Sequence, residues 1–185
     1  MIYILTGMAK TGKSILAKEL SKQTGFSIIP TDYIMMMFHK TDRTLGVDAT
    51  DSDPSVSKAL EPYLMSLIET MIENKDDYII EGVHFLPTFS KKLMSCYPND
   101  IKILYLGYKD WSPIRKKEDL ILHKKNTKNC WYGHYNDQEL FKLSEYLVKE
   151  SIKLYQEVIK FELNYIEVTH IIDQIPKIIE DLLNK

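Results

Sequence analysis

Short apolar runs rich in β-branched residues alternate along the chain with longer segments whose apolar residues recur at helical spacing. The strand-like runs lie at residues 2–5, 27–29, 78–81, 101–106 and 165–168. The longer segments have the period of amphipathic helices. This alternation predicts an α/β fold, in which crossover helices join the strands of a parallel sheet.

Capping and helix-breaking residues indicate where the helices begin and end. Helices are expected at residues 53–74, 87–97 and 137–161, with a short last helix from about residue 176. Asp53 followed by Pro54 is typical of an N-cap with proline in the first turn. Pro62 is expected to kink its helix or to start a new one, and Asp173 is expected to cap the last helix.

Composition bounds the class of protein. With 185 residues, of which 44% are apolar and 27% charged, the chain suits one soluble domain that spans residues 1–185. A net charge of -2 and a pI near 6.2 argue against binding of nucleic acid by bulk electrostatics. We find no apolar run long enough for a membrane span, no secretory signal and no disulfide framework. These features favour a cytoplasmic protein.

The first strand leads directly into a phosphate-binding sequence, G-x-x-x-x-G-K-S, and a helical segment follows it. The residues of this loop are Gly7, Met8, Ala9, Lys10, Thr11, Gly12, Lys13 and Ser14. In such a P-loop the backbone N–H groups face an anion, the lysine reaches the β- and γ-phosphates, and the hydroxyl holds Mg²⁺. The motif therefore predicts binding of a nucleoside triphosphate.

Polar residues follow the second and third strands, where ligands of a doubly wound sheet bind. We interpret Asp32 as the general base or as a ligand of Mg²⁺ or its water, although it could also cap a helix. Glu81 ends an apolar strand and needs a partner there, whether metal-bound water, a lysine, a substrate hydroxyl or a structural ion pair. His84 either contacts substrate or serves as a structural hydrogen-bond donor.

A basic segment after the fourth strand, residues 115–136, is a candidate lid. Its cations are Arg115, Lys116, Lys117, Lys124, Lys125 and Lys128. At least one of them is expected to close on phosphate, and arginine suits bidentate contact best. The alternative is a solvated helix face. The aromatic cluster at residues 131–135 is expected to pack the lid rather than to cover a ligand.

These features together resemble the adenylate-kinase-like P-loop kinases, a group that includes shikimate, gluconate and nucleoside monophosphate kinases and the zeta toxins. The phrase Ile-Ile-Glu-Gly-Val-His at residues 79–84 is similar to a segment of 2-phosphoglycerate kinases. The resemblance covers nearly the whole chain in order of elements. It implies a three-layer fold with a five-stranded parallel sheet in the order 2-3-1-4-5. It also implies a lid, Asp32 as catalytic base with Lys13 and Arg115, and an acceptor-binding region near residues 31–75.

The chain departs from that group where a nucleotide acceptor would bind. No arginine follows Glu81 and Gly82, and the lid holds one arginine among lysines. Both departures argue against a nucleotide as acceptor. Arg43 could meet an anionic substrate together with Asp32, Glu81 and His84, or it could be a solvent-facing loop residue.

The sequence thus favours a kinase that transfers the γ-phosphate of Mg-ATP to a hydroxyl of a small metabolite. Two alternatives are a zeta-toxin-like kinase of a nucleotide sugar and a non-catalytic ATP-binding regulatory module. The densest lysines lie in one short segment and the net charge is slightly negative, so a nucleic-acid partner is not expected. Neither the acceptor nor the oligomeric state follows from the sequence.

Overall fold

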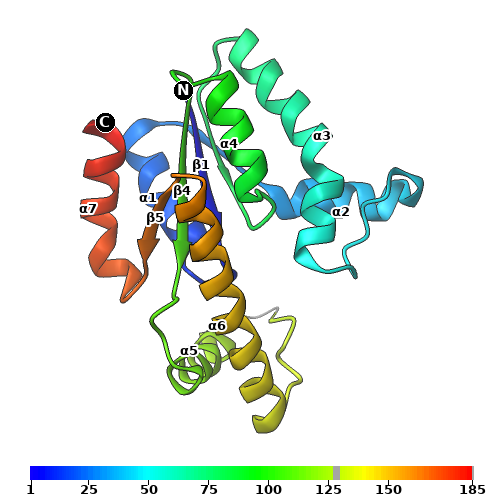
Figure 1. Ribbon diagram of the computed structural model, residues 1–185, viewed down its shortest axis with the longest axis vertical. Helices are drawn as coiled ribbons and strands as arrows, with labels where there is room; N and C mark the ends of the chain where they lie inside the picture. The colour runs from blue at the N-terminus through cyan, green and yellow to red at the C-terminus, as the bar shows by residue number, and fades with distance from the viewer. Residues whose placement is uncertain (127–129, 185) are drawn as a thin grey trace.

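A computed structural model describes residues 1–126 and 130–184, and these form a single five-stranded sheet with helices on both faces (Figure 1). The strands are β1 (Ile2–Gly7), β2 (Ser27–Pro30), β3 (Tyr78–Glu81), β4 (Ile101–Gly107) and β5 (Asn164–Glu167). All four neighbouring pairs are parallel, and the order is β2-β3-β1-β4-β5. The predicted fold class and strand order are confirmed.

Two helices cover one face of the sheet and three cover the other. On the first face lie α1 (Lys13–Thr24) and α7 (Ile171–Asn184), and on the second lie α3 (Asp53–Glu73), α4 (Pro87–Cys96) and α6 (Asp137–Lys160) (Figure 1). The remaining helices are α2 (Thr31–Thr41), the 3₁₀ turn η1 (Arg43–Leu45) and α5 (Pro113–Asn126). The described helices are all too short or too polar to cross a membrane.

Strand alternation divides the core between the two faces. Ile2 and Ile4 of β1 join the cluster under α3, α4 and α6, whereas Tyr3 and Leu5 join the cluster under α1 and α7. β1 is central in the sheet and every one of its residues is buried. The strand that carries the P-loop is therefore held rigidly from both sides.

The region predicted as a lid has a small core of its own in its described residues. α5 packs against α6, and the buried residues there are Tyr108, Leu120, Tyr132, Leu140, Leu147 and Val148. Met8 of the P-loop packs against the same cluster. Within the aromatic segment Tyr132 is fully buried and Trp131 is about half exposed. The burial of Tyr132 supports the interpretation that this segment packs the predicted lid.

Three predicted boundaries differ from the structure. α7 begins at Ile171 rather than near Pro176, because the Gln174 side chain accepts hydrogen bonds from the backbone N–H groups of Thr169 and His170 and so caps the helix earlier. α3 continues through Pro62 as one helix, so of the two expected effects of Pro62 the start of a new helix does not occur. β5 lies one residue earlier than expected, at Asn164–Glu167.

Candidate active site

The P-loop joins β1 to α1 through two glycines with positive φ. Gly7 has φ 111° and Gly12 has φ 84°. A Cβ atom on Gly7 would collide with the backbone of Leu106, and one on Gly12 would lie 2.9 Å from the side chain of Ile171. Glycine is needed at both positions for conformation and for space. The loop ends at the N-terminus of α1, where free N–H groups favour an anion.

The side chain of Lys13 is buried against its own loop. Its Nζ donates a hydrogen bond of 2.6 Å to the carbonyl oxygen of Met8. Burial lowers the pKa of Lys13 to about 8, and the charges of Glu81 and Asp32 partly oppose this shift. If a phosphate took the place of the Met8 carbonyl oxygen as the partner of Lys13 Nζ, its negative charge would stabilise the protonated side chain and raise the pKa of Lys13 again.

Ser14 and Glu81 meet beside Lys13. The Ser14 hydroxyl donates to Glu81 Oε1 at 3.1 Å. Strand register sets this geometry, because Glu81 ends β3 opposite Leu5 on one side and Pro30 on the other. Burial raises the pKa of the Glu81 carboxyl, and the nearby Lys13 counteracts that shift. The sequence analysis expected a partner for the Glu81 carboxylate. The structure provides the Ser14 hydroxyl, with the ammonium group of Lys13 nearby.

His84 anchors the first turn of α2, which carries Asp32. Its Nδ1 shares a hydrogen bond of 2.6 Å with the Thr31 hydroxyl and lies 3.8 Å from Asp32 Oδ1. His84 is 2% exposed, and its burial lowers its pKa, although the charge of Asp32 opposes this. A Cβ atom on Gly82 would collide with the Thr31 hydroxyl. These contacts support the structural interpretation of His84 and leave Asp32, at 69% exposed, facing solvent at the site.

Lys116 has a position that sequence reasoning did not single out. This α5 side chain is fully buried, and its Nζ donates to the Lys10 carbonyl oxygen at 3.1 Å and to Asp119 Oδ2 at 2.9 Å. The ammonium group also lies 3.9 Å from the ring centre of Tyr108, whose hydroxyl donates to the Ala9 carbonyl oxygen at 3.0 Å. Tyr108 and Lys116 therefore hold the P-loop from the β4–α5 side. The sequence showed only a run of cations.

Arg115 makes its contacts away from this cluster. Arg115 donates to the Thr169 carbonyl oxygen at 2.7 Å and stacks on Trp111, with its guanidinium carbon 4.1 Å from the ring centre. Its catalytic role stays a prediction. Arg43 lies in η1, and its side chain is outside the described residues, as is Lys128 of the lid.

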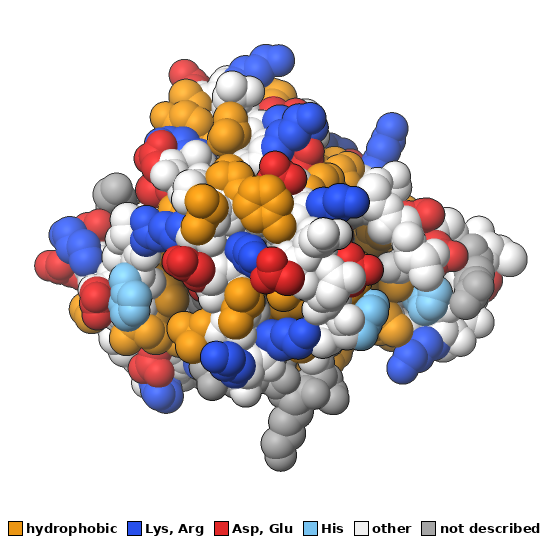
Figure 2. Space-filling view, turned by 90° about the horizontal axis from the view of Figure 1, so that it is seen from below, with side chains coloured by type: hydrophobic (Ala, Val, Ile, Leu, Met, Phe, Trp, Pro, Cys, Tyr) orange, Lys and Arg blue, Asp and Glu red, His pale blue; other side chains and the backbone are white. Residues whose placement is uncertain are grey.

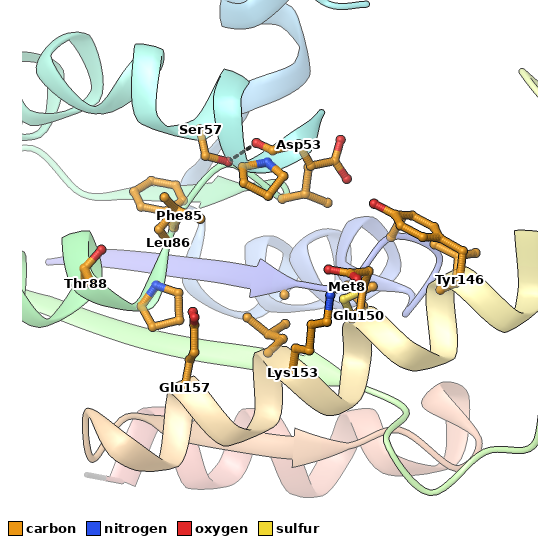
Figure 3. A pocket seen from close by; sticks show the side chains of 17 residues that line it. Met8, Asp53, Ser57, Phe85, Leu86, Thr88, Tyr146, Glu150, Lys153 and Glu157 are labelled. Atoms are coloured by element: carbon orange, nitrogen blue, oxygen red, sulfur yellow. Dashed lines mark hydrogen bonds and ion pairs between the residues drawn. The ribbon is translucent and has the colours of Figure 1, made fainter. Parts of the chain in front are cut away.

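A cavity of about 390 Å³ opens beside the first residues of the P-loop, between α3, α4 and α6. Gly7, Met8 and Ala9 line one end of it. Figure 3 shows side chains that enter it from opposite walls, among them Asp53 of α3 and Tyr146 of α6. The space thus lies next to the position where Lys13 would hold a phosphate, and residues 53–57 of the predicted acceptor region contribute to its wall.

Comparison with known proteins bears on the fold. No protein-family profile and no curated protein sequence matches the chain. A shikimate kinase from Bacteroides thetaiotaomicron superimposes with a TM-score of 0.63 at 18% identity, over 100% of this chain and 97% of that one. A gluconokinase from Sinorhizobium meliloti 1021 superimposes with a TM-score of 0.53 at 14% identity, over 98% of this chain and 94% of that one. A deoxyadenosine kinase from M. mycoides superimposes with a TM-score of 0.52 at 15% identity, over 100% of this chain and 99% of that one.

The chain has the P-loop kinase fold. The similarity extends over nearly the full length of these neighbours, so all layers of the fold are shared. With identities of 14 to 18%, the likeness defines the architecture and not the activity. The activity must be inferred from the side chains that this chain places on the fold.

The oxygen donors of this P-loop kinase fold suit Mg²⁺. The Ser14 hydroxyl and the Glu81 carboxylate are within hydrogen-bond distance, and the carboxylate of Asp32 is close enough for its charge to act on both Lys13 and Glu81. Among the described residues, no group of three or more His, Cys, Asp or Glu side chains is arranged to hold a metal ion. In nucleotide sites Mg²⁺ keeps several waters and binds few protein oxygens along with phosphate oxygens.

Acidic and basic side chains are intermingled on the face of the molecule seen in Figure 2. The electrostatic potential over that face is therefore divided into small regions of opposite sign. The absence of a nucleic-acid partner stays a prediction that rests on net charge.

Proposed function

We propose that the protein transfers the γ-phosphoryl group of ATP to a hydroxyl group of a small molecule bound in the cavity. The main support for this proposal is that the P-loop forms part of the wall of the cavity. A complete P-loop, with Lys13 buried on it, shares Met8 and Ala9 with the wall of the cavity. A donor phosphate on the loop and an acceptor in the cavity would therefore be neighbours.

Positioning and charge neutralisation account for most of the catalysis of phosphoryl transfer. In the proposed reaction Lys13 and the loop N–H groups hold the β- and γ-phosphates. Ser14 would bind Mg²⁺ directly, with Glu81 and Asp32 within reach of its waters, and the ion would neutralise charge on the phosphate oxygens. Lys116 and Tyr108 keep the loop backbone in place through its carbonyl groups.

Asp32 is the proposed general base. The acceptor oxygen forms a bond to the γ-phosphorus as the bond to the ADP oxygen breaks, and the hydroxyl proton passes to the Asp32 carboxylate. His84 acts as a positioning residue, since its contact with Thr31 fixes the helical turn from which Asp32 projects. Its lowered pKa keeps the imidazole neutral, so it does not compete with Lys13 for the phosphate.

ADP release from Mg-ATP in the presence of pooled hydroxyl compounds tests this proposal. We expect one pool to raise turnover in the wild type and to have no effect in Lys13→Ala or Asp32→Asn. Exposed residues provide matched controls, Lys22→Ala on the same helix as Lys13 and Asp76→Asn for Asp32, and both should behave as wild type. Tight ATP binding without any acceptor effect would instead support the regulatory module.

A further inference from the structure

The charged side chains that line the cavity are mostly acidic. Asp53, Glu150 and Glu157 are its carboxylates, and Lys153 is the one cationic residue among the described residues of its wall. Lys153 already forms an ion pair of 2.6 Å with Glu150. Asp53 and Glu157 make no ion pair within the described part of the chain, so two negative charges remain for a ligand.

The rest of the wall strengthens the effect of these charges. Apolar side chains, including those of Val83, Phe85 and Leu154, form much of the lining. Asp53, Lys153 and Glu157 are exposed to solvent, and a ligand that displaced water beside these apolar side chains would strengthen a charge pair made with them. Tyr146 adds an aromatic face, and its pKa is raised by partial burial and by the negative charges of Glu150 and Asp53. Carboxylates beside an aromatic ring are suited to an ammonium group.

A polar group without a partner lies on the same face of the sheet. The Thr6 hydroxyl is fully buried and makes no hydrogen bond within the described part of the chain. By strand alternation Thr6 points to the side of Ile2 and Ile4, towards α3, α4 and α6, and it directly precedes Gly7 of the cavity wall. Thr6 is not among the residues that line the cavity, so a ligand bound there is not placed against its hydroxyl.

We propose that the acceptor is a hydroxylated amine, whose protonated amino group is held by the cavity carboxylates. This inference rests on the proposed kinase function and specifies its substrate class. A carboxylic or phosphorylated acceptor would meet two negative charges and, among the described residues of the wall, no cation outside the Lys153–Glu150 ion pair. A neutral polyol would bury Asp53 and Glu157 without compensating their lost hydration, which costs free energy.

The positions of the carboxylates orient the acceptor. Asp53 lies towards the phosphate end, because its charge acts on His84 as well as on Tyr146. Glu157 lies about 10 Å further along α6 than Glu150, and its charge acts on Tyr105 under α4. In the proposed orientation the amino group lies at the Glu157 end, and the hydroxyl is directed past Asp53 to the P-loop.

Matched acceptors test the inference. Each set contains an amino alcohol, the diol that replaces its amine with a hydroxyl, and the hydroxy acid of the same carbon length. ADP release with Mg-ATP is measured for the wild type, Glu157→Gln, Asp53→Asn and the control Glu145→Gln, which is exposed on α6 and outside the cavity wall. A second readout, independent of turnover, is the shift in Tm that each acceptor produces with a non-hydrolysable ATP analogue.

We expect the amine to exceed its diol and acid by about tenfold or more in kcat/KM, as a charge-assisted contact implies. Glu157→Gln should remove that preference mainly by raising KM for the amine, and it should abolish the Tm shift that the amine produces, while Glu145→Gln keeps both the preference and the shift. Preference for the acid or the diol, or an amine preference that survives in both Glu157→Gln and Asp53→Asn, overturns the inference and leaves the kinase standing. Failure to transfer phosphate to any compound overturns both.

Discussion

The ammonium group of Lys13 is buried among carbonyl groups, and burial lowers its pKa to about 8. A bound polyphosphate favours the charged form, so the pKa must be higher in the complex. Below about pH 8 the ammonium is present in both states and this group adds no pH dependence. Above it, the free protein loses its proton and must regain one on binding. ATP affinity should therefore fall as pH rises through 8.

Calorimetry of ATP binding in buffers of different ionisation enthalpy checks this prediction. At pH 8.5 to 9 we expect net proton uptake on binding, up to about one proton as the pH rises, and this uptake should be absent in Lys13→Met. Lys22→Met serves as the control, because Lys22 is exposed and pairs with Glu19 on the far side of the helix. Binding with no proton uptake, or equal uptake in Lys13→Met, would contradict the role assigned to Lys13.

Lys116 supports the P-loop from α5, and its loss should affect both stability and nucleotide binding. Lys116→Met keeps the length of the side chain but removes its bonds to the Lys10 carbonyl and Asp119. We expect the free energy of unfolding to fall by about 1–3 kcal/mol, the usual effect of leaving buried partners unsatisfied. ATP affinity should also fall, because the loop backbone at Lys10 loses its support.

Urea unfolding and ATP titration measure these two effects. The neighbouring Lys117→Met removes an ion pair to the exposed Asp137 and should change the unfolding free energy by less than about 1 kcal/mol. If the two variants were equally stable and bound ATP equally well, the contacts of Lys116 would have no part in holding the loop.

At the scale of elements, α6 connects the lid region, the cavity wall and the core under the sheet. Its N-terminus carries a capping box, in which Asn136 Oδ1 accepts from the N–H groups of Gln138 and Glu139 while Glu139 accepts from the Asn136 N–H. Asn136→Ala should lower the free energy of unfolding by about 1 kcal/mol. It should also speed hydrogen exchange in the first turn of α6 more than in the turns that line the cavity.

The exposed Gln138→Ala is the matched control for this change, since Gln138 contributes only its backbone N–H to the box. Exchange and stability in that variant should stay near wild type. Equal protection in Asn136→Ala and wild type would show that packing of α6 on α5, and not the cap, fixes the start of the helix.

Elements set by local chemistry were predicted from the sequence, and those set by tertiary contact were not. The P-loop and the strands follow from glycine spacing and apolar runs, which act over a few residues. The start of α7 depends on the Gln174 side chain and on Ile171 packed at Gly12. Lys116 is buried because α5 turns this side chain towards Tyr108. The residues next to Lys116 in the sequence do not show which lysine of the segment is turned inward.

At the scale of the whole molecule, the strand order gathers distant residues at one edge of the sheet. The adjacent ends of β1, β3 and β2 bring the P-loop, Glu81 and Asp32 together, as parallel doubly wound sheets do. The sequence predicted this assembly because these residues directly follow apolar strands, and the strand order was implied by the resemblance to P-loop kinases. The sequence did not predict the acidic cavity. Glu150 and Glu157 lie on α6, and only the packing of α6 against the rest of the fold shows that they line the cavity.

Transfer of phosphate to a hydroxyl rather than to water distinguishes the proposed kinase from an ATPase. The most direct measurement follows γ-labelled ATP with acceptor pools and counts the labelled organic phosphate against labelled inorganic phosphate for each ADP released. We predict that with the productive pool almost every ADP is matched by an organic phosphate ester, and that Lys13→Ala and Asp32→Asn form none. Label found only in inorganic phosphate, with or without acceptors, would contradict the account.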